Sequence, residues 1–220
     1  MFQATHVGRD HVRVGRNNQD GVFSSPSVVV VTDGCSSHPQ SEVGALLGAR
    51  FLGHWLTTQR ELTADLPLRA IDALCGWLSQ STLALGPEVE ANLERYFLFT
   101  CLAAIRVGER AMIFGLGDGA FCVDDELVRL EAGPDNAPPY CAYRLTTQGS
   151  RPEPQLHFLG AATRLAVMTD GLNPLDPVRL RALIATAGLE RNPLTLQRRL
   201  NVLAETERFT DDATLAVLGS

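Results

Sequence analysis

The spacing of apolar residues predicts two pairs of helices in this chain. Apolar residues recur at every third or fourth position over residues 41–58 and again over about 63–83, so each stretch has one apolar face. Two more helices are expected at about 177–187 and 193–206, because each stretch opens on a capping residue followed by proline.

Short apolar runs rich in β-branched residues lie before, between and after these helix pairs, and they predict strands. Residues 22–23 and 28–32 should form a hairpin, and four runs within 97–130, separated by turn signals, predict an antiparallel meander. Further strands are expected from an alternating stretch at 5–14 and from runs at 156–159, 164–169 and 213–218. This order of elements predicts an α+β layered domain.

Composition adds limits on the class of protein. The 220 residues, 45% hydrophobic and 20% charged, suit one globular domain covering residues 1–220. No apolar run approaches the roughly 20 residues of a membrane span, and the N-terminus lacks the apolar core of a secretion signal, so we expect a cytoplasmic protein. The net charge of −6 and the dispersed basic residues argue against nucleic acid or an anionic membrane as a partner.

Several chemistries are excluded by residue types. All 19 basic residues are arginine, so no lysine can act in a P-loop, as a Schiff base or as a general base. None of the five cysteines, which we expect to be reduced, has an arginine six positions later, and this excludes the Cys-x5-Arg loop of cysteine-dependent phosphatases. The segment from Cys35 to His38 lacks the partner pair of a zinc site.

Three apolar runs end in an aspartate followed by glycine, at Asp33, Asp118 and Asp170, and the pair Asp211-Asp212 precedes the last apolar run. A buried strand delivers a terminal carboxylate to a sheet edge, where a following glycine lets backbone or ligand approach closely. A single Asp-Gly is usually only a turn. Several of them on comparable strand ends predict one shared cation site.

Carboxylate oxygens are the ligands that Mg²⁺ and Mn²⁺ prefer, and Asp33, Asp170 and Asp211 would meet that need. Two such ions about 3.5–4 Å apart can activate a water between them and screen the charge of a phosphoryl group under attack. Without a cation, the carboxylates would repel one another, which would raise some of their pKa values and lower stability. We therefore expect metal to stabilise the fold.

Five motifs, in their residues and in their order along the chain, resemble those of the metal-dependent PP2C-type (PPM) protein phosphatases. They are most similar to the motifs of the short, divergent bacterial branch of that family. The motifs are NNQDG at 17–21, VVVVTDGCSSH at 28–38, FGLGDG at 114–119, LAVMTDGL at 165–172 and FTDDATLAVL at 209–218. The resemblance covers almost the whole chain. It implies an αββα sandwich, in which two central antiparallel sheets are flanked by helix pairs.

The resemblance also implies a set of metal ligands. Asp33 would bridge two Mn²⁺ or Mg²⁺ ions, and the Gly34 carbonyl would bind one of them. Asp170 and Asp211 would complete the other ion.

Further acidic residues would assist this pair of ions. By the same resemblance, Asp20 would hold metal-bound water, and Asp118 with Asp170 would form a third, more weakly bound metal site. Asp212 is the alternative to Asp211 as a ligand, and otherwise would cap a local turn.

One departure from the family pattern concerns the phosphate-binding arginine, which usually lies five residues before the first aspartate. Gly15 holds that position here, so Arg16, one residue closer, is the expected phosphate ligand, with Arg13 as the alternative. A solvated surface role for either arginine is the competing interpretation. His38 is a candidate general acid toward the leaving group, with a structural contact as its alternative.

The sequence thus predicts a metal-dependent protein serine/threonine phosphatase. The expected reaction is hydrolysis of phosphoserine and phosphothreonine by a hydroxide that bridges two ions, on a monomeric enzyme whose substrate is made by a Ser/Thr kinase. One alternative is an inactive PP2C-like module that binds a phosphorylated partner or a kinase. Another is a phosphatase restricted to one regulatory protein, such as an anti-sigma antagonist. The proline-rich segment 132–154 is the expected determinant of substrate selectivity.

Overall fold

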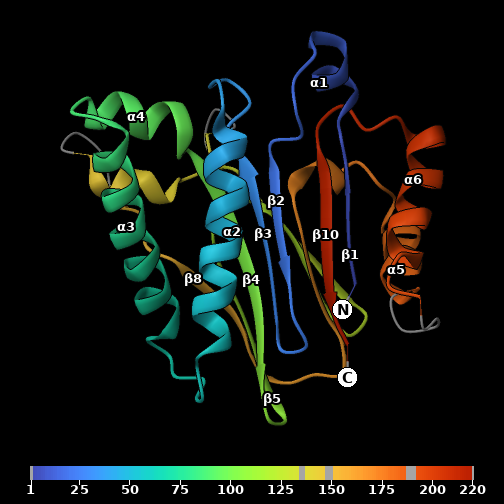
Figure 1. Ribbon diagram of the computed structural model, residues 1–220. Helices are drawn as coiled ribbons and strands as arrows, with labels where there is room; N and C mark the ends of the chain where they lie inside the picture. Colours follow the sequence, from blue (N-terminus) through green and yellow to red (C-terminus); the bar gives the residue numbers. More distant parts are fainter. Residues whose placement is uncertain (1, 134–136, 147–150, 187–191, 220) are drawn as a thin grey trace.

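Two five-stranded antiparallel sheets lie face to face, and helices cover their outer faces (Figure 1). The computed structural model describes residues 2–133, 137–146, 151–186 and 192–219. This αββα sandwich confirms the fold class predicted from the sequence. In the described part of the chain, no helix has both the length and the apolar character needed to cross a membrane.

The first sheet joins the two ends of the chain. Its strands, in spatial order, are β1 (Phe2–His6), β10 (Ala213–Leu218), β9 (Leu165–Met168), β6 (Gly119–Val123) and β7 (Glu126–Leu130). The helices α5 (Pro177–Ala185) and α6 (Thr195–Glu207) cover its outer face. The predicted capping residue of α5 is confirmed, because the Asp176 carboxylate accepts a hydrogen bond from the backbone N–H of Val178 at 2.9 Å.

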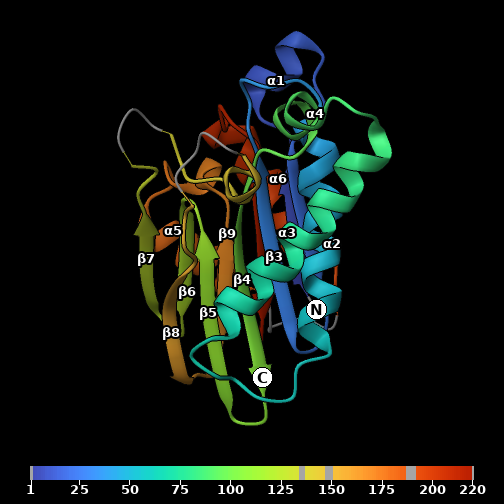
Figure 2. The same cartoon turned by 90° about the vertical axis from the view of Figure 1, so that its left-hand side faces the viewer.

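The second sheet carries the larger helical layer (Figure 2). Its strands, in spatial order, are β2 (Asp20–Ser24), β3 (Val28–Gly34), β4 (Phe99–Val107), β5 (Arg110–Leu116) and β8 (Gln155–Ala161). Three helices belong to this layer: α2 (Ser41–Thr57), α3 (Leu66–Leu85) and α4 (Val89–Tyr96).

The run of four valines in β3 is explained by burial on both faces of its sheet. Val28 and Val30 pack under the helices, whereas Val29 and Val31 pack between the two sheets. Side chains alternate along a strand, so the next odd position, Asp33, faces the space between the sheets at the end of β3. The strand itself therefore aims this carboxylate at the opposing sheet.

The predicted meander over residues 97–130 was wrong in one respect. β5 pairs with β4 and β8 in the second sheet, whereas β6 pairs with β7 and β9 in the first sheet. The chain changes sheets in the turn that contains Asp118. Gly119 makes this possible, because its φ is 118° and an added Cβ would lie 2.5 Å from the Met168 carbonyl oxygen.

Three other differences involve short or polar segments. The alternating stretch at 5–14 divides into β1 and a short helix, α1 (Arg9–Val14), and the eight-residue α4 was not predicted. The apolar residues of α4, Val89, Leu93 and Tyr96, recur at helical spacing and pack on the core, but its eight residues are fewer than the window of about 11–18 residues over which such periodicity is read. The proline-rich segment contains a short 3-10 helix, η2 (Cys141–Leu145), while residues 134–136 and 147–150 lie outside the described residues.

Candidate functional site

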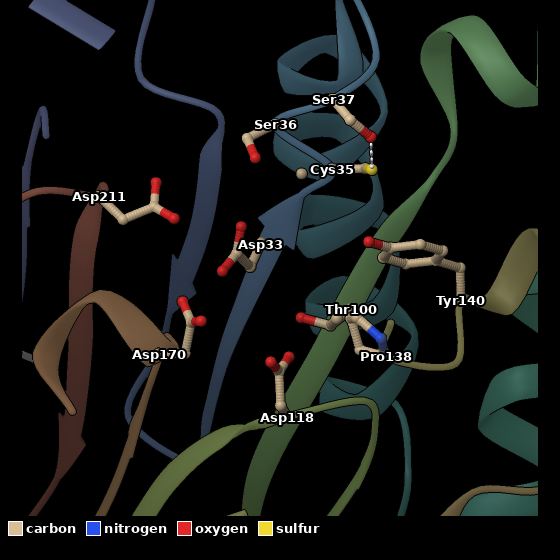
Figure 3. A pocket seen from close by; sticks show the side chains of 11 residues that line it. Asp33, Cys35, Ser36, Ser37, Thr100, Asp118, Pro138, Tyr140, Asp170 and Asp211 are labelled. Atoms are coloured by element: carbon tan, nitrogen blue, oxygen red, sulfur yellow. Dashed lines mark hydrogen bonds between the residues drawn. The ribbon is translucent and has the colours of Figure 1, made fainter. Parts of the chain in front are cut away.

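Four aspartates from both sheets meet in one cavity at the end of the sandwich (Figure 3). Asp33 ends β3, Asp118 lies where the chain changes sheets, Asp170 follows β9, and Asp211 precedes β10. We call this space the acidic cavity. Its lining is completed by Gly34, Cys35, Ser36, Ser37, Thr100, Pro138 and Tyr140.

Strand register explains why these side chains share one edge. Asp33 is paired with Asp20 on one side and with Thr100 on the other, so the three residues form one row across β2, β3 and β4. The opposing sheet contributes Asp170 and Asp211 from strand ends on the same side of the sandwich. Residues that are far apart in sequence are thus brought together by two independent sheet registers.

A close backbone approach holds the two aspartates of the first sheet near each other. A Cβ added to Gly171 would lie 1.8 Å from the carbonyl oxygen of Asp212, a separation that no side chain tolerates. The glycine after Asp170 is therefore required for this turn to pack against the Asp211-Asp212 turn. The Asp-Gly pattern predicted this function for the glycine.

Two carboxylate oxygens near the cavity are buried without a partner among the described residues. They are Oδ1 of Asp20 and Oδ1 of Asp170. The other oxygen of Asp20 accepts a hydrogen bond from the Thr169 hydroxyl at 2.9 Å, which fixes the orientation of the carboxylate. Unpartnered buried carboxylate oxygens cost free energy unless a cation or an ordered water meets them.

Burial and mutual repulsion raise the pKa values of the carboxyl groups in this cluster. The pKa of Asp33 is well above its ordinary value because the group is buried and faces the charges of Asp20 and Asp170. Burial, assisted by the charge of Asp170, raises the pKa of Asp118 to about 6. The pKa of Asp211 is raised for the same reason, with burial as the main cause. The cluster therefore favours bound protons or bound cations.

The residues present fit hard divalent cations. The cavity supplies carboxylate oxygens and no basic side chain among the lining residues that the structure describes. Its volume of about 210 Å³ is far above the roughly 10–15 Å³ that one water requires, so ions could keep several waters here. Mg²⁺ and Mn²⁺ in proteins are typically held by a few carboxylates together with retained waters.

Asp212, adjacent to Asp211, has a different environment. It is 2% exposed and accepts hydrogen bonds from the backbone N–H of Gly8 at 2.7 Å and of Gln19 at 2.6 Å, with His11 Nδ1 at 2.8 Å. Its oxygens are thus occupied by contacts that bind β10 to the start of α1 and β2.

Potential ligand atoms of His11, Asp211 and Asp212 lie within 4.8 Å of one another. Because both oxygens of Asp212 already accept hydrogen bonds, this trio is a structural network, and Asp211 alone turns to the acidic cavity. The sequence alone could not separate the roles of two adjacent aspartates.

The predicted phosphate ligand lies in a second cavity that shares a wall with the first. We call this second space the Arg16 cavity. It shares Ser36 and Asp211 with the acidic cavity. The rest of its lining consists of Asp10, His11, Val14, Arg16 and Thr210. The Arg16 guanidinium donates a hydrogen bond to the Ser36 carbonyl oxygen. Arg13 is exposed on α1 and does not belong to the lining of either cavity.

His38, the candidate general acid, contacts two residues of the acidic-cavity lining, Cys35 and Ser37. Its Nδ1 is 3.3 Å from Cys35 Sγ and 3.1 Å from Ser37 Oγ, and the imidazole is not part of the cavity lining. These contacts are of the structural kind named as the alternative, and the general-acid role stays a prediction.

The sequence analysis missed two residues that shape the site. Thr169, which orients Asp20, also accepts a hydrogen bond from the backbone N–H of Thr214 at 3.0 Å and so ties β9 to β10. Its position directly before Asp170 was the available signal. Tyr140 forms part of the cavity wall opposite Asp33 (Figure 3), and only its place within the proline-rich segment indicated such a role.

Comparisons with known proteins agree with this geometry. The family model for protein phosphatase 2C matches residues 7–213, nearly the whole chain. No curated protein matches the chain in sequence.

Solved structures with the same fold are distant in sequence. A bacterial serine phosphatase has a TM-score of 0.69 and 15% identity, with 98% of this chain and 95% of that chain covered. The serine/threonine phosphatase Stp1 from Staphylococcus aureus has a TM-score of 0.67 and 15% identity, with 99% and 93% covered.

The catalytic domain of the serine threonine protein phosphatase PstP, solved with two manganese ions, has a TM-score of 0.63 and 19% identity, with 98% and 96% covered. These likenesses confirm the fold, and the family match confirms the enzyme class predicted from the sequence, phosphoprotein phosphatase. The chain belongs to the protein phosphatase 2C family.

Proposed function

We propose that this protein hydrolyses phosphoserine and phosphothreonine in proteins with the help of two Mn²⁺ or Mg²⁺ ions. The observation that carries the proposal is the convergence of four aspartates from two sheets on one cavity whose described lining has no basic side chain. The PstP catalytic domain, which shares the fold, was solved with two manganese ions, and this supports the choice of metal. When bound, the ions would activate water and neutralise the charge of the phosphoryl group.

Each of the two sheets would contribute ligands to the ions. Asp33 and the Gly34 carbonyl would bind from the second sheet, whereas Asp170 and Asp211 would bind from the first. The unpartnered Oδ1 of Asp170 is available for direct ligation.

Asp20 and Asp118 would have supporting roles. Asp20 is held by Thr169 and keeps its other oxygen free, which suits a hydrogen bond to a water in the metal shell. Asp118, at the change of sheets, would contribute to a third and weaker ion together with Asp170.

Arg16 is the chain's best candidate for binding the substrate phosphate. A guanidinium binds phosphate oxygens in a bidentate manner. Its present partner, the Ser36 carbonyl, belongs to the wall common to both cavities, so the side chain lies beside the acidic cavity rather than inside it. If the Arg16 guanidinium exchanged the Ser36 carbonyl for an oxygen of the substrate phosphate, the phosphate would lie next to the aspartates of the acidic cavity.

Direct attack by water, without a phosphoenzyme, agrees with the side chains present. The aspartates are required as ligands, and the Cys-x5-Arg loop of covalent cysteine phosphatases does not occur in the sequence. His38 lies outside the lining, so we assign no proton transfer to it.

Hydrolysis of p-nitrophenyl phosphate and of a phosphothreonine peptide tests the proposal. Each assay is run with Mn²⁺, with Mg²⁺ and with a chelator, on wild type and on the variants Asp33→Asn and Asp170→Asn. Turnover should require metal and should be lost in both variants. The matched control is Asp125→Asn, since Asp125 is an exposed aspartate in the β6–β7 turn, and this variant should keep wild-type turnover.

The result that would overturn the proposal is a wild-type protein that binds Mn²⁺ but hydrolyses neither substrate. An equal loss of turnover in the Asp125→Asn control would also overturn the proposal, because removal of an exposed aspartate would then have the same effect as removal of one in the acidic cavity.

A further inference from the structure

Two thiols, one from α3 and one from η2, meet in the hydrophobic core on the helical side of the second sheet. Cys75 Sγ, on α3, lies 3.4 Å from Cys141 Sγ, at the first residue of η2. All five cysteines are free thiols, and these two are separated by 66 positions in sequence. The pair was not predicted, because the sequence spacing of the cysteines carries no signal for a long-range contact.

The surroundings of the pair favour reactivity at Cys75. Arg144 lies over this part of α3, where its guanidinium pairs with Asp72 at 2.9 Å, one helical turn before Cys75. The hydrogen bond with Cys141, followed by the nearby positive charge of Arg144, lowers the pKa of Cys75 against the opposing effect of burial. Cys75 is 7% exposed, so a small reagent has limited access to its sulfur.

Cys101 offers a contrast within the same hydrophobic core. It is 2% exposed, and burial raises its pKa to about 12, so it has the properties of an inert buried thiol.

The backbone connects the pair to the site. Cys141 directly follows Tyr140, whose side chain lines the acidic cavity together with that of Cys35. Cys35 in turn follows Asp33 and Gly34 along the chain and lines the same cavity. A displacement of Cys141 is therefore transmitted through one peptide bond to a wall of the site.

We propose that Cys75 and Cys141 form a reversible disulfide, a modification site that couples hydrogen peroxide to phosphatase activity. The Cys75 thiolate attacks one peroxide oxygen, the O–O bond breaks, and the sulfur becomes a sulfenic acid while the other oxygen leaves as water. The Cys141 sulfur then attacks the sulfenic sulfur, the S–S bond forms, and a second water leaves. Two thiols are oxidised and one peroxide is reduced; a dithiol reverses the reaction by exchange.

The disulfide demands a small but defined movement. A disulfide has an S–S separation of about 2.05 Å, so the two sulfur atoms must approach each other from 3.4 Å. Cys141 and Tyr140 belong to the same core as α3, so closing this gap must shift one of the two elements, and a shift of η2 moves Tyr140. The altered cavity wall should lower turnover.

Treatment of the purified protein with hydrogen peroxide tests this inference, followed by peptide mass spectrometry and by phosphatase assays before and after reduction with dithiothreitol. We expect a peptide linked through Cys75 and Cys141, together with a loss in kcat/KM of about fivefold, the lower end of typical couplings between sites. Dithiothreitol should restore the activity. Cys75→Ala and Cys141→Ala should each lack the linked peptide and the fivefold loss, whereas Cys101→Ala, the matched buried control, should keep both.

Two results would overturn the inference. One is the absence of the linked peptide in oxidised wild type, and the other is an activity loss that persists unchanged in both Cys75→Ala and Cys141→Ala, which would assign the effect to Cys35. The coupling to activity rests on the proposed function, but the disulfide does not. A linked peptide in a protein without any turnover would contradict the proposed function and the coupling while leaving the cross-link established.

Discussion

The acidic cavity and the Arg16 cavity share Ser36 and Asp211 but differ in charge. The first has four aspartates and no basic residue in its described lining, and the second contains Arg16 and His11 beside Asp10 and Asp211. In the proposed function, the ions and the arginine that bind a phosphomonoester lie in neighbouring cavities that share one wall. Strand ends thus position the carboxylates that we propose as metal ligands, whereas α1 and the turn after it position Arg16, the proposed phosphate ligand.

The largest effect is expected from a change in the acidic cavity. Asp33→Asn should lower kcat/KM at least about 100-fold, because even residues that only support metal ligands cost 10- to 100-fold when replaced. The same variant should be more stable than wild type at pH 7 in chelator, since a neutral amide removes a buried charge that Asp20 and Asp170 repel. Thermal unfolding in chelator measures this second effect, and a less stable Asp33→Asn protein would contradict it.

The adjacent pair Asp211 and Asp212 provides the next comparison. Asp211→Asn should lose activity with little change in stability, whereas Asp212→Asn should lower the free energy of unfolding by about 1–3 kcal/mol, because donors at Gly8 and Gln19 would face an amide. Urea unfolding and kcat/KM of both variants separate the two roles. The reverse pattern would show that Asp212 is the ligand and that Asp211 is structural.

A smaller effect is expected in the Arg16 cavity. Arg16→Ala should raise KM for a phosphopeptide by about tenfold, because the substrate phosphate would lose one charge-assisted hydrogen bond. The affinity for Mn²⁺ should not change. Arg13→Ala serves as the matched control, because Arg13 is exposed on the neighbouring helix and lines neither cavity. If Arg13→Ala raises KM and Arg16→Ala does not, the assignment of the phosphate ligand must be exchanged.

The smallest effect is a dependence of stability on pH in the metal-free protein. Burial raises the pKa of Asp118 from 3.8 to about 6, so the folded state holds this proton more tightly than the unfolded state. Its stabilising contribution is complete below pH 4 and is lost as pH rises through about 6. The increase in Tm on adding Mn²⁺ should therefore be larger at pH 7 than at pH 5, and an equal increase at both values would exclude this carboxyl from the metal response.

Much of the acidic cavity could be predicted because its signals are local. A strand that ends in Asp-Gly carries its own evidence, although four identical valines at 28–31 do not tell which face of the sheet Asp33 joins, and only the packing of the two sheets does. The choice between Asp211 and Asp212 depended on contacts with Gly8 and Gln19, which lie about 190 to 200 positions away. No local pattern encodes such contacts.

The remaining errors have the same physical origin. The runs around Asp118 look alike whether a chain continues in one sheet or crosses to another, because both arrangements need short apolar strands and a glycine turn. The helix α4 has an apolar face, but its eight residues are too short a stretch for periodicity alone to predict a helix. The meeting of Cys75 with Cys141 depends on how α3 packs against η2, which only the tertiary structure determines.

Calorimetric titration of Mn²⁺ into the metal-free protein tests the central claim most directly. Wild type and the Asp125→Asn control should bind Mn²⁺ with the same affinity and stoichiometry, and Asp33→Asn should lose most of that binding. Undiminished binding in Asp33→Asn would contradict the account, because the acidic cavity would then not be the metal site.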